Sequence, residues 1–245
     1  MDKAKLWAKR ILDLVIVLLI IHFMGISSYM LSNSLGIYVP YFGSESLYLT
    51  RALQRVIQLV FVILIMRFVF KKPFSQWGFN LKDASVSLKL VLRFLPFFFC
   101  IELAYLLFAK YIMASNIGMQ YTPKLLNVLI IFAFQGLFTG TSEEPVFRGM
   151  VITLLKNSWN MSFKLLNLKI EMTTILSAII FAVAHMEFSF GPFRILYWNP
   201  WQMLTAFLLG VYYAYVFEKT QSLLNPILAH NASNVIIVLL SMLLT

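Results

Sequence analysis

Two adjacent glutamates and a nearby arginine are the residues of this chain best suited to chemistry. Glu143, Glu144 and Arg148 stand in the stretch TSEEPVFRGM, at the end of an apolar run, in a chain that is 60% hydrophobic and has only 10 acidic residues. Ionisable residues at membrane depth are costly and are usually functional. A carboxylate held in such surroundings is suited to accept a proton as a general base.

The spacing within this stretch assigns different tasks to the two carboxylates. Glu144 and Arg148 are four residues apart, so on a helix they share a face and are expected to form an ion pair. Glu143 points about 100° away from Glu144, because a helix has about 3.6 residues per turn. We therefore expect Glu144 to be structural and Glu143 to be free for chemistry. Pro145 removes a backbone donor, which predicts a disturbance of the helix at this point.

Two of the three histidines fall in later apolar segments, at depths similar to that of the glutamates. At a rise of about 1.5 Å per residue, Glu143 and His185 each lie roughly 18–20 Å from the loop that joins their segments. On the same scale, His230 and Asn234 lie roughly 9–15 Å deep. These two are four residues apart, so both can donate hydrogen bonds toward one point. Three separate helices are thus expected to bring a carboxylate, two imidazoles and an amide together.

The elements that position these side chains are expected to be membrane helices. Only 12% of the residues are charged, whereas soluble domains have about a quarter. The predicted class is therefore all-α, a polytopic bundle of transmembrane helices in a single domain, residues 1–245, with the motif region at 125–244. Seven apolar segments are visible, at residues 11–30, 57–70, 90–108, 125–155, 172–187, 201–217 and 224–244. A half-inserted eighth segment at residues 38–49 is an alternative.

The basic residues predict the orientation of the chain and exclude one class of partner. Lysines and arginines gather at the connections on the side of the N-terminus, for example Lys71, Lys72 and Lys164, and fewer, such as Arg55, fall on the opposite side. This bias predicts that the N-terminus is inside. The net charge of +10 is spread over the ends of apolar runs rather than clustered, which argues against nucleic-acid binding. We expect a multi-pass protein of the cell membrane.

Three short motifs carry a family resemblance. EEPVFR at Glu143–Arg148, FAVAH at Phe181–His185 and HNASN at His230–Asn234 match the patterns EExxxR, FxxxH and HxxxN. In this order and on late membrane segments, they resemble the CPBP family (CaaX protease and bacteriocin-processing, or Abi) of intramembrane glutamic endopeptidases. The resemblance covers residues 125–244, and the earlier segments match only in being hydrophobic. Seven helices rather than eight is a departure from the family pattern.

The resemblance implies an intramembrane peptidase with a glutamate-dependent mechanism and no cofactor. By position, Glu143 would be the general base, and His185 would help it to hold and activate a water molecule. His230 and Asn234 would form the oxyanion hole. Neutral imidazole and amide donors can stabilise the negative charge of a tetrahedral intermediate.

The resemblance also implies supporting residues and a class of substrate. Glu144 and Arg148 would be the supporting pair. The substrate would be a peptide or a membrane protein that reaches the site from the bilayer. Bacterial relatives suggest bacteriocin or signalling-peptide processing, or immunity to bacteriocins, and eukaryotic relatives suggest prenylated CaaX proteins. The oligomeric state is not predicted.

Three other interpretations stay open. Glu143, His185 and His230 could bind zinc and leave an open position for water, although no HExxH motif is present and Asn234 is a poor zinc ligand. The chain could be a non-catalytic membrane scaffold or regulator of the same fold. It could also be a small transporter, although the opposite halves of the segments show few polar residues.

Overall fold

The computed structural model describes residues 2–35, 46–113, 124–165, 167–190 and 193–244. Most of these residues are helical, and each of the seven predicted apolar segments coincides with a helix. The helices are α1 (Lys3–Ser34), α2 (Ser46–Leu64), α3 (Ala84–Tyr111), α4 (Leu125–Ala133), α5 (Gly140–Glu144), α6 (Thr153–Leu155), α7 (Met172–Val183), α8 (Pro200–Thr220) and α9 (Leu224–Leu244). Three π-helical stretches and one 3₁₀ turn complete them, at Ile65–Val69, Phe134–Thr139, Pro145–Ile152 and Phe74–Trp77.

Five of these helical stretches are long and apolar enough to cross a membrane. They are Lys3–Ser34, Tyr48–Val69, Ala84–Tyr111, Leu125–Leu155 and Leu224–Leu244. The helix α7 is apolar but shorter. The protein is therefore a membrane protein built as a helical bundle, as predicted, while the number of spans and the inward N-terminus stay predictions.

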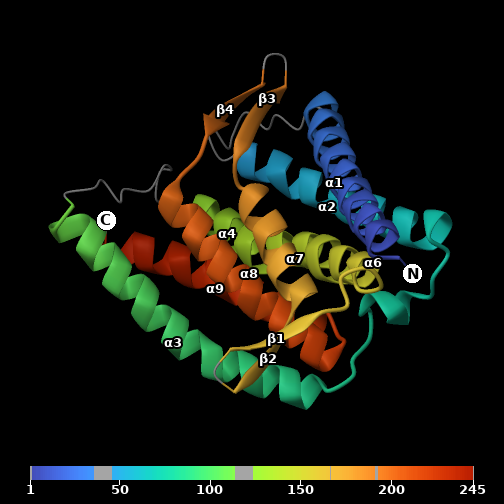
Figure 1. Cartoon of the computed structure of the whole chain (residues 1–245). Coiled ribbons are helices and arrows are strands. Elements are labelled where there is room, and N and C mark those ends of the chain that lie inside the picture. Colours follow the sequence, from blue (N-terminus) through green and yellow to red (C-terminus); the bar gives the residue numbers. More distant parts are fainter. Residues whose placement is uncertain (1, 36–45, 114–123, 166, 191–192, 245) are drawn as a thin grey trace.

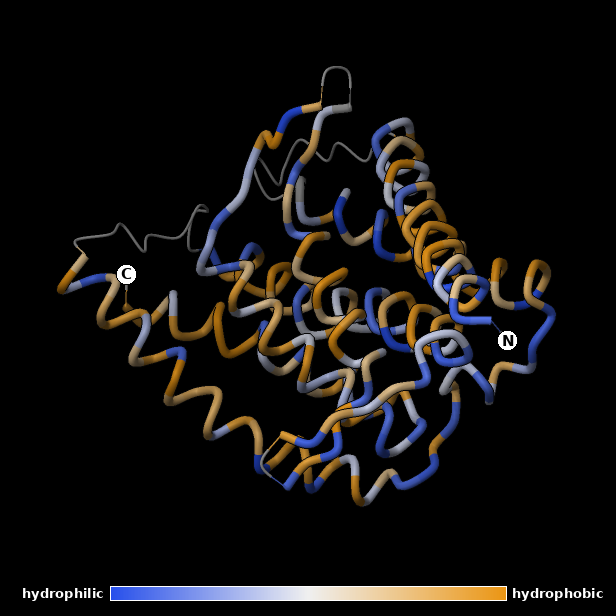
Figure 2. The backbone as a smooth tube through the Cα atoms, viewed as in Figure 1, coloured by the Kyte–Doolittle hydropathy of each residue, from blue (hydrophilic) through white to orange (hydrophobic). Residues whose placement is uncertain are grey.

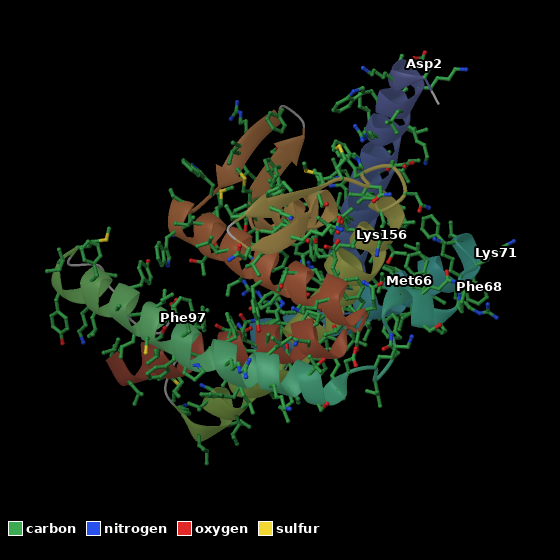
Figure 3. All side chains as sticks on the ribbon, turned by 60° about the horizontal axis from the view of Figure 1, so that its bottom comes forward. Asp2, Met66, Phe68, Lys71, Phe97 and Lys156 are labelled. Atoms are coloured by element: carbon green, nitrogen blue, oxygen red, sulfur yellow. The ribbon has the colours of Figure 1, made fainter. Side chains whose placement is uncertain are left out.

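The outer surface of the bundle is hydrophobic, as a lipid-facing surface must be. Hydrophobic residues run along α1 and α3, and hydrophilic ones are frequent in the connection before α3 (Figure 2). Phe68 and Phe97 project outward (Figure 3), and each is 66% exposed. By contrast, Met66 beside Phe68 is fully buried. In water such a surface would be an interaction or aggregation site, so its natural neighbour is the hydrocarbon of a bilayer.

Two short antiparallel hairpins depart from the all-α prediction. The first pairs β1 (Ser162–Leu165) with β2 (Leu168–Glu171), and the second pairs β3 (Glu187–Phe190) with β4 (Phe193–Tyr197). They lie at opposite ends of α7 (Figure 1). The predicted fifth segment, residues 172–187, was therefore too long, since the helix ends at Val183 and the chain turns into β3.

The alternative eighth segment falls mostly outside the described residues. Of residues 38–49, only 46–49 are described, and they form the first turn of α2. The second apolar segment thus begins earlier than predicted, because α2 extends from Ser46 into the polar sequence before residue 57. This extension places Arg55 within a membrane helix rather than in a connection.

The helix that carries the two glutamates lies in the core of the bundle. The helix α5 contacts α2 and α9, and the π-helical stretch after it contacts α7 and α8. Val146, Met150 and Val151 of this stretch are fully buried and belong to the largest hydrophobic cluster, together with Met66 and Phe181. α3 and α1 lie along opposite edges of the bundle, with α7, α8 and α9 between them (Figure 1). The motif residues are thus held by neighbours on several sides.

Candidate active site

The backbone around the two glutamates is irregular. Glu143 and Glu144 end the short helix α5, and π-helical stretches stand before and after it, at Phe134–Thr139 and Pro145–Ile152. The second stretch begins at Pro145, whose missing N–H cannot continue α-helical hydrogen bonding. The predicted disturbance of the helix therefore takes the form of a change to π-helical geometry. This geometry is rare in proteins, and where it occurs it is often at a functional site.

Glu144 forms the predicted ion pair and a second, unpredicted contact. Its Oε2 lies 3.0 Å from Nε of Arg148, and both side chains are fully buried. Its Oε1 lies 2.7 Å from Nδ1 of His230, which comes from α9. Because a carboxylate only accepts, this imidazole nitrogen donates its N–H to Glu144. One carboxylate therefore connects the first motif to the third.

The guanidinium of Arg148 is surrounded by aromatic rings. Its central carbon lies 4.6 Å from the ring centroid of Phe181, 5.6 Å from that of Tyr213 and 5.9 Å from that of Phe147. Its two terminal nitrogens have no hydrogen-bond partner in the part of the chain that the structure describes. A cation over aromatic faces is stabilised by the ring quadrupoles. The buried charge is thus held by one carboxylate and three rings.

Glu143 has an ion-pair partner that the sequence did not predict. Its Oε1 lies 2.6 Å from Nη2 of Arg55 in α2, and its side chain is only 7% exposed. Its Oε2 lies 3.8 Å from Nε2 of His230. Arg55 also donates from Nη1 to Oε1 of Gln58 at 2.9 Å. Sequence reasoning missed Arg55 because it placed this arginine in a connection, and the only signal was a basic residue next to an apolar run.

His185 lies just beyond the end of α7. Its Nδ1 is 2.8 Å from the carbonyl oxygen of Phe181. A carbonyl oxygen only accepts, so in the neutral ring Nδ1 carries the hydrogen and Nε2 is left as an acceptor. The Phe181 ring packs edge-on against His185 at 4.8 Å and against His230 at 5.6 Å. The phenylalanine of the second motif therefore sits between the two histidines.

A cavity of about 350 Å³ joins three of the four predicted catalytic residues. His185, His230 and Asn234 line it, together with residues of α3 and α8. Cavities of 300–1,000 Å³ are typical of ligand sites. Glu143 does not line this cavity itself, but its Oε2 lies 3.8 Å from Nε2 of His230, which does. The four residues are thus brought to one region, with the carboxylate next to a histidine that lines the cavity.

Asn231 is a site residue that sequence reasoning did not select. Its Oδ1 accepts from the backbone N–H of Gly140 at 2.7 Å, and its Nδ2 donates to Oγ1 of Thr141 at 3.3 Å. A Cβ atom at position 140 would lie 2.6 Å from Asn231 Oδ1. Asn231 therefore fixes α9 against the start of α5, and only glycine at position 140 allows this approach. The HxxxN pattern and the four-residue spacing from His230 selected Asn234, and no sequence signal pointed to Asn231.

The zinc interpretation finds no ligand set among the described residues. No three His, Cys, Asp or Glu side chains of the described ranges are grouped so that they could hold a metal ion. Glu143 is bound instead to the guanidinium of Arg55, which competes with a cation for the same oxygen. Whether cleavage depends on a metal ion is therefore to be tested by measuring cleavage in the presence of a chelator.

The comparisons with known proteins agree with the motifs. The model of the family described as type II CAAX prenyl endopeptidase Rce1-like matches residues 125–236. This range begins at α4 and includes all three motifs, and it confirms the resemblance to the CPBP family. A search of curated proteins and a search of solved structures found no match.

Proposed function

Because residues 125–236 match the model of the Rce1-like CAAX prenyl endopeptidases, we propose that the protein is a glutamate-dependent intramembrane endopeptidase. It hydrolyses a peptide bond of a membrane-associated or small secreted peptide. The observation that carries the proposal is the buried Glu143 carboxylate next to His230, which lines a cavity together with His185 and Asn234. A general base, its water-holding partner and two donors are the groups that such a hydrolysis requires.

The geometry selects one oxygen of Glu143 as the base. Oε1 is bound to Arg55, whereas Oε2 faces His230, which lines the cavity. Water held between this oxygen and the unprotonated Nε2 of His185 attacks the carbonyl carbon, and its proton passes to Oε2. When the tetrahedral intermediate collapses, the C–N bond breaks and Glu143 returns the proton to the leaving amine.

The charges of the cluster are balanced before substrate binds. Two carboxylates, Glu143 and Glu144, face two guanidiniums, Arg55 and Arg148, and His230 stands between the carboxylates. An unpaired charge in this buried place would be strongly unfavourable. Arg55 thus lets Glu143 stay ionised without solvent, and Oε2 stays able to accept the proton.

The two proposed oxyanion donors differ in what they require. His230 gives its Nδ1–H to Glu144, so Nε2 can donate only when the ring carries a second proton. Asn234 has an amide that donates in every state, and it makes no side-chain hydrogen bond to another described residue. The amide is therefore the donor that is always available to a negative oxygen in the cavity.

The substrate class follows from the location of the site. The cavity lies between helices of a membrane bundle, so the peptide bond has to reach it from the bilayer or from the membrane surface. Bacteriocin or signalling-peptide precursors, and prenylated CaaX proteins as in the name of the matching family, are the substrate candidates. We place the protein in the cell membrane with its N-terminus inside.

The test compares peptide cleavage by the wild type and by Glu143→Gln in liposomes. Glutamine keeps the shape of the side chain but cannot take a proton, so we expect cleavage to fall by about 10²–10⁴-fold. Glu187→Gln, an exposed glutamate of β3, is the matched control and should cleave like the wild type. Full cellular function of Glu143→Gln would instead indicate a non-catalytic scaffold of the same fold.

A further inference from the structure

The cavity beside the two histidines also contains an acidic residue that the proposed hydrolysis does not use. Glu102 of α3 lines it and is only 5% exposed. It lies within a 28-residue helix that is long and apolar enough to cross a membrane. Carboxylates in such helices are rare and mark the paths of substrates and ions.

Glu102 has no partner within the described ranges. No hydrogen bond and no ion pair joins its carboxylate to another described side chain, and Arg93 of the same helix is exposed. Protein surrounds most of the Glu102 side chain, and the side chain lines the cavity. A buried carboxylate without a partner is strongly unfavourable. Glu102 therefore offers an unpaired carboxyl to a group that enters the cavity.

The neighbours of Glu102 define the chemistry of that group. Tyr105 lies three residues later on the same face of α3 and stacks on Trp201 of α8, with ring centroids 3.9 Å apart. Both rings line the cavity, as do Gln202 and Thr205. Aromatic faces attract cations electrostatically, and a carboxylate binds an ammonium or guanidinium through charge-assisted hydrogen bonds. A carboxylate beside stacked rings is thus suited to a positively charged group.

We propose that Glu102, Tyr105 and Trp201 form a subsite for a cationic group of the substrate, a lysine or arginine side chain or a free N-terminal amine. The inference rests on the proposed function, because it assumes that a peptide occupies the cavity. His185, His230 and Asn234 line the same cavity, so the cation lies within a few residues of the bond that is cleaved. The subsite makes Glu102 a specificity-determining residue and gives it no part in the bond cleavage.

The test uses synthetic membrane peptides in liposomes, identical except at one position near the cleaved bond. That position carries lysine, norleucine or glutamate, and each peptide is made with a free and with an acetylated N-terminus. We expect the wild type to prefer lysine over norleucine by about 10–100-fold in kcat/KM, as one charge-assisted hydrogen bond allows. In Glu102→Gln this ratio should collapse toward one, mainly through KM, and Glu187→Gln should keep it. Thermal unfolding of each variant checks that it is folded.

These peptides distinguish a lysine side chain from an N-terminal amine as the bound cation, and they test the subsite separately from the peptidase activity. A preference that depends on the free N-terminus rather than on lysine assigns the subsite to the amine. Photo-crosslinking of the same peptides to Glu143→Gln measures binding without cleavage. Lysine-selective crosslinking that requires Glu102, without cleavage by the wild type, would keep the subsite and remove the peptidase assignment. Efficient cleavage without any preference for a cation would overturn the subsite and leave the peptidase.

Discussion

The contact between α5 and α9 makes Gly140→Ala the most demanding test of the site. A Cβ atom at position 140 would lie 2.6 Å from Oδ1 of Asn231 and 3.0 Å from Cβ of His230. Carbon and oxygen atoms that are not bonded do not approach to 2.6 Å. Either the Asn231 side chain or the whole of α9 must move, and α9 carries two of the proposed catalytic groups.

The magnitude follows from three effects. Overpacking a well-packed interior costs about 1–3 kcal/mol. Displacing Asn231 breaks the 2.7 Å hydrogen bond from the Gly140 N–H, and a buried donor left unsatisfied costs about 1–3 kcal/mol more. The higher helix propensity of alanine offsets up to about 1 kcal/mol. We expect a net destabilisation of about 1–6 kcal/mol, together with a loss of cleavage because His230 shifts relative to Glu143.

The assay is unfolding in detergent micelles, with cleavage measured on the same preparations. Gly25→Ala is the matched control, since nothing lies within 4 Å of the added Cβ in α1, and we expect no loss and a gain of up to about 1 kcal/mol. In the double variant Gly140→Ala/Asn231→Ala the closest clash is gone, so its cost should be less than the sum of the two single costs. A Gly140→Ala protein as stable and as active as Gly25→Ala would refute the α5–α9 contact described here.

Three further variants probe the charged cluster. Arg148→Met leaves the fully buried Glu144 without its guanidinium partner, and we expect a loss of about 3–5 kcal/mol in unfolding free energy. The control Arg67→Met, on the exposed surface, should leave the stability nearly unchanged. Arg55→Met removes the counterion of Glu143. Because Arg55 is 27% exposed, the loss of unfolding free energy should be smaller, about 1–3 kcal/mol. An unchanged stability would argue against the ion pair. Asn234→Ala should lower kcat by about 10²–10³-fold with little change in KM, as for removal of an oxyanion donor, and a change in KM alone would assign Asn234 to substrate binding instead.

Local rules explain what the sequence predicted correctly. The ion pair of Glu144 and Arg148 depends only on helical spacing, and the structure confirms it. The helices coincide with the apolar segments because membrane helices need long apolar runs. The helical rise alone placed His230 shallower than Glu143, yet Oε2 and Nε2 are 3.8 Å apart, so the packing of α9 against α5 closes a gap that the rise left open.

Long-range contacts explain what the sequence could not predict. Arg55 meets Glu143 across 88 positions of the chain only because α2 packs on α5, and no spacing rule connects two such residues. Asn231 is selected over Asn234 as the partner of Gly140 by the rotation of α9, which depends on its packing. The two hairpins and the early end of α7 lie where apolar residues continue into short strands, so hydropathy alone extends the helix too far.

Turnover after complete chelation tests most directly whether Glu143 activates water without a metal. One peptide is cleaved by the wild type and by Glu143→Gln in liposomes, with a chelator and then with added zinc. We expect the wild type to keep its kcat in the chelator and Glu143→Gln to stay about 10²–10⁴-fold slower in every condition. Loss of wild-type cleavage on chelation, with recovery on zinc and comparable turnover by Glu143→Gln, would contradict the account.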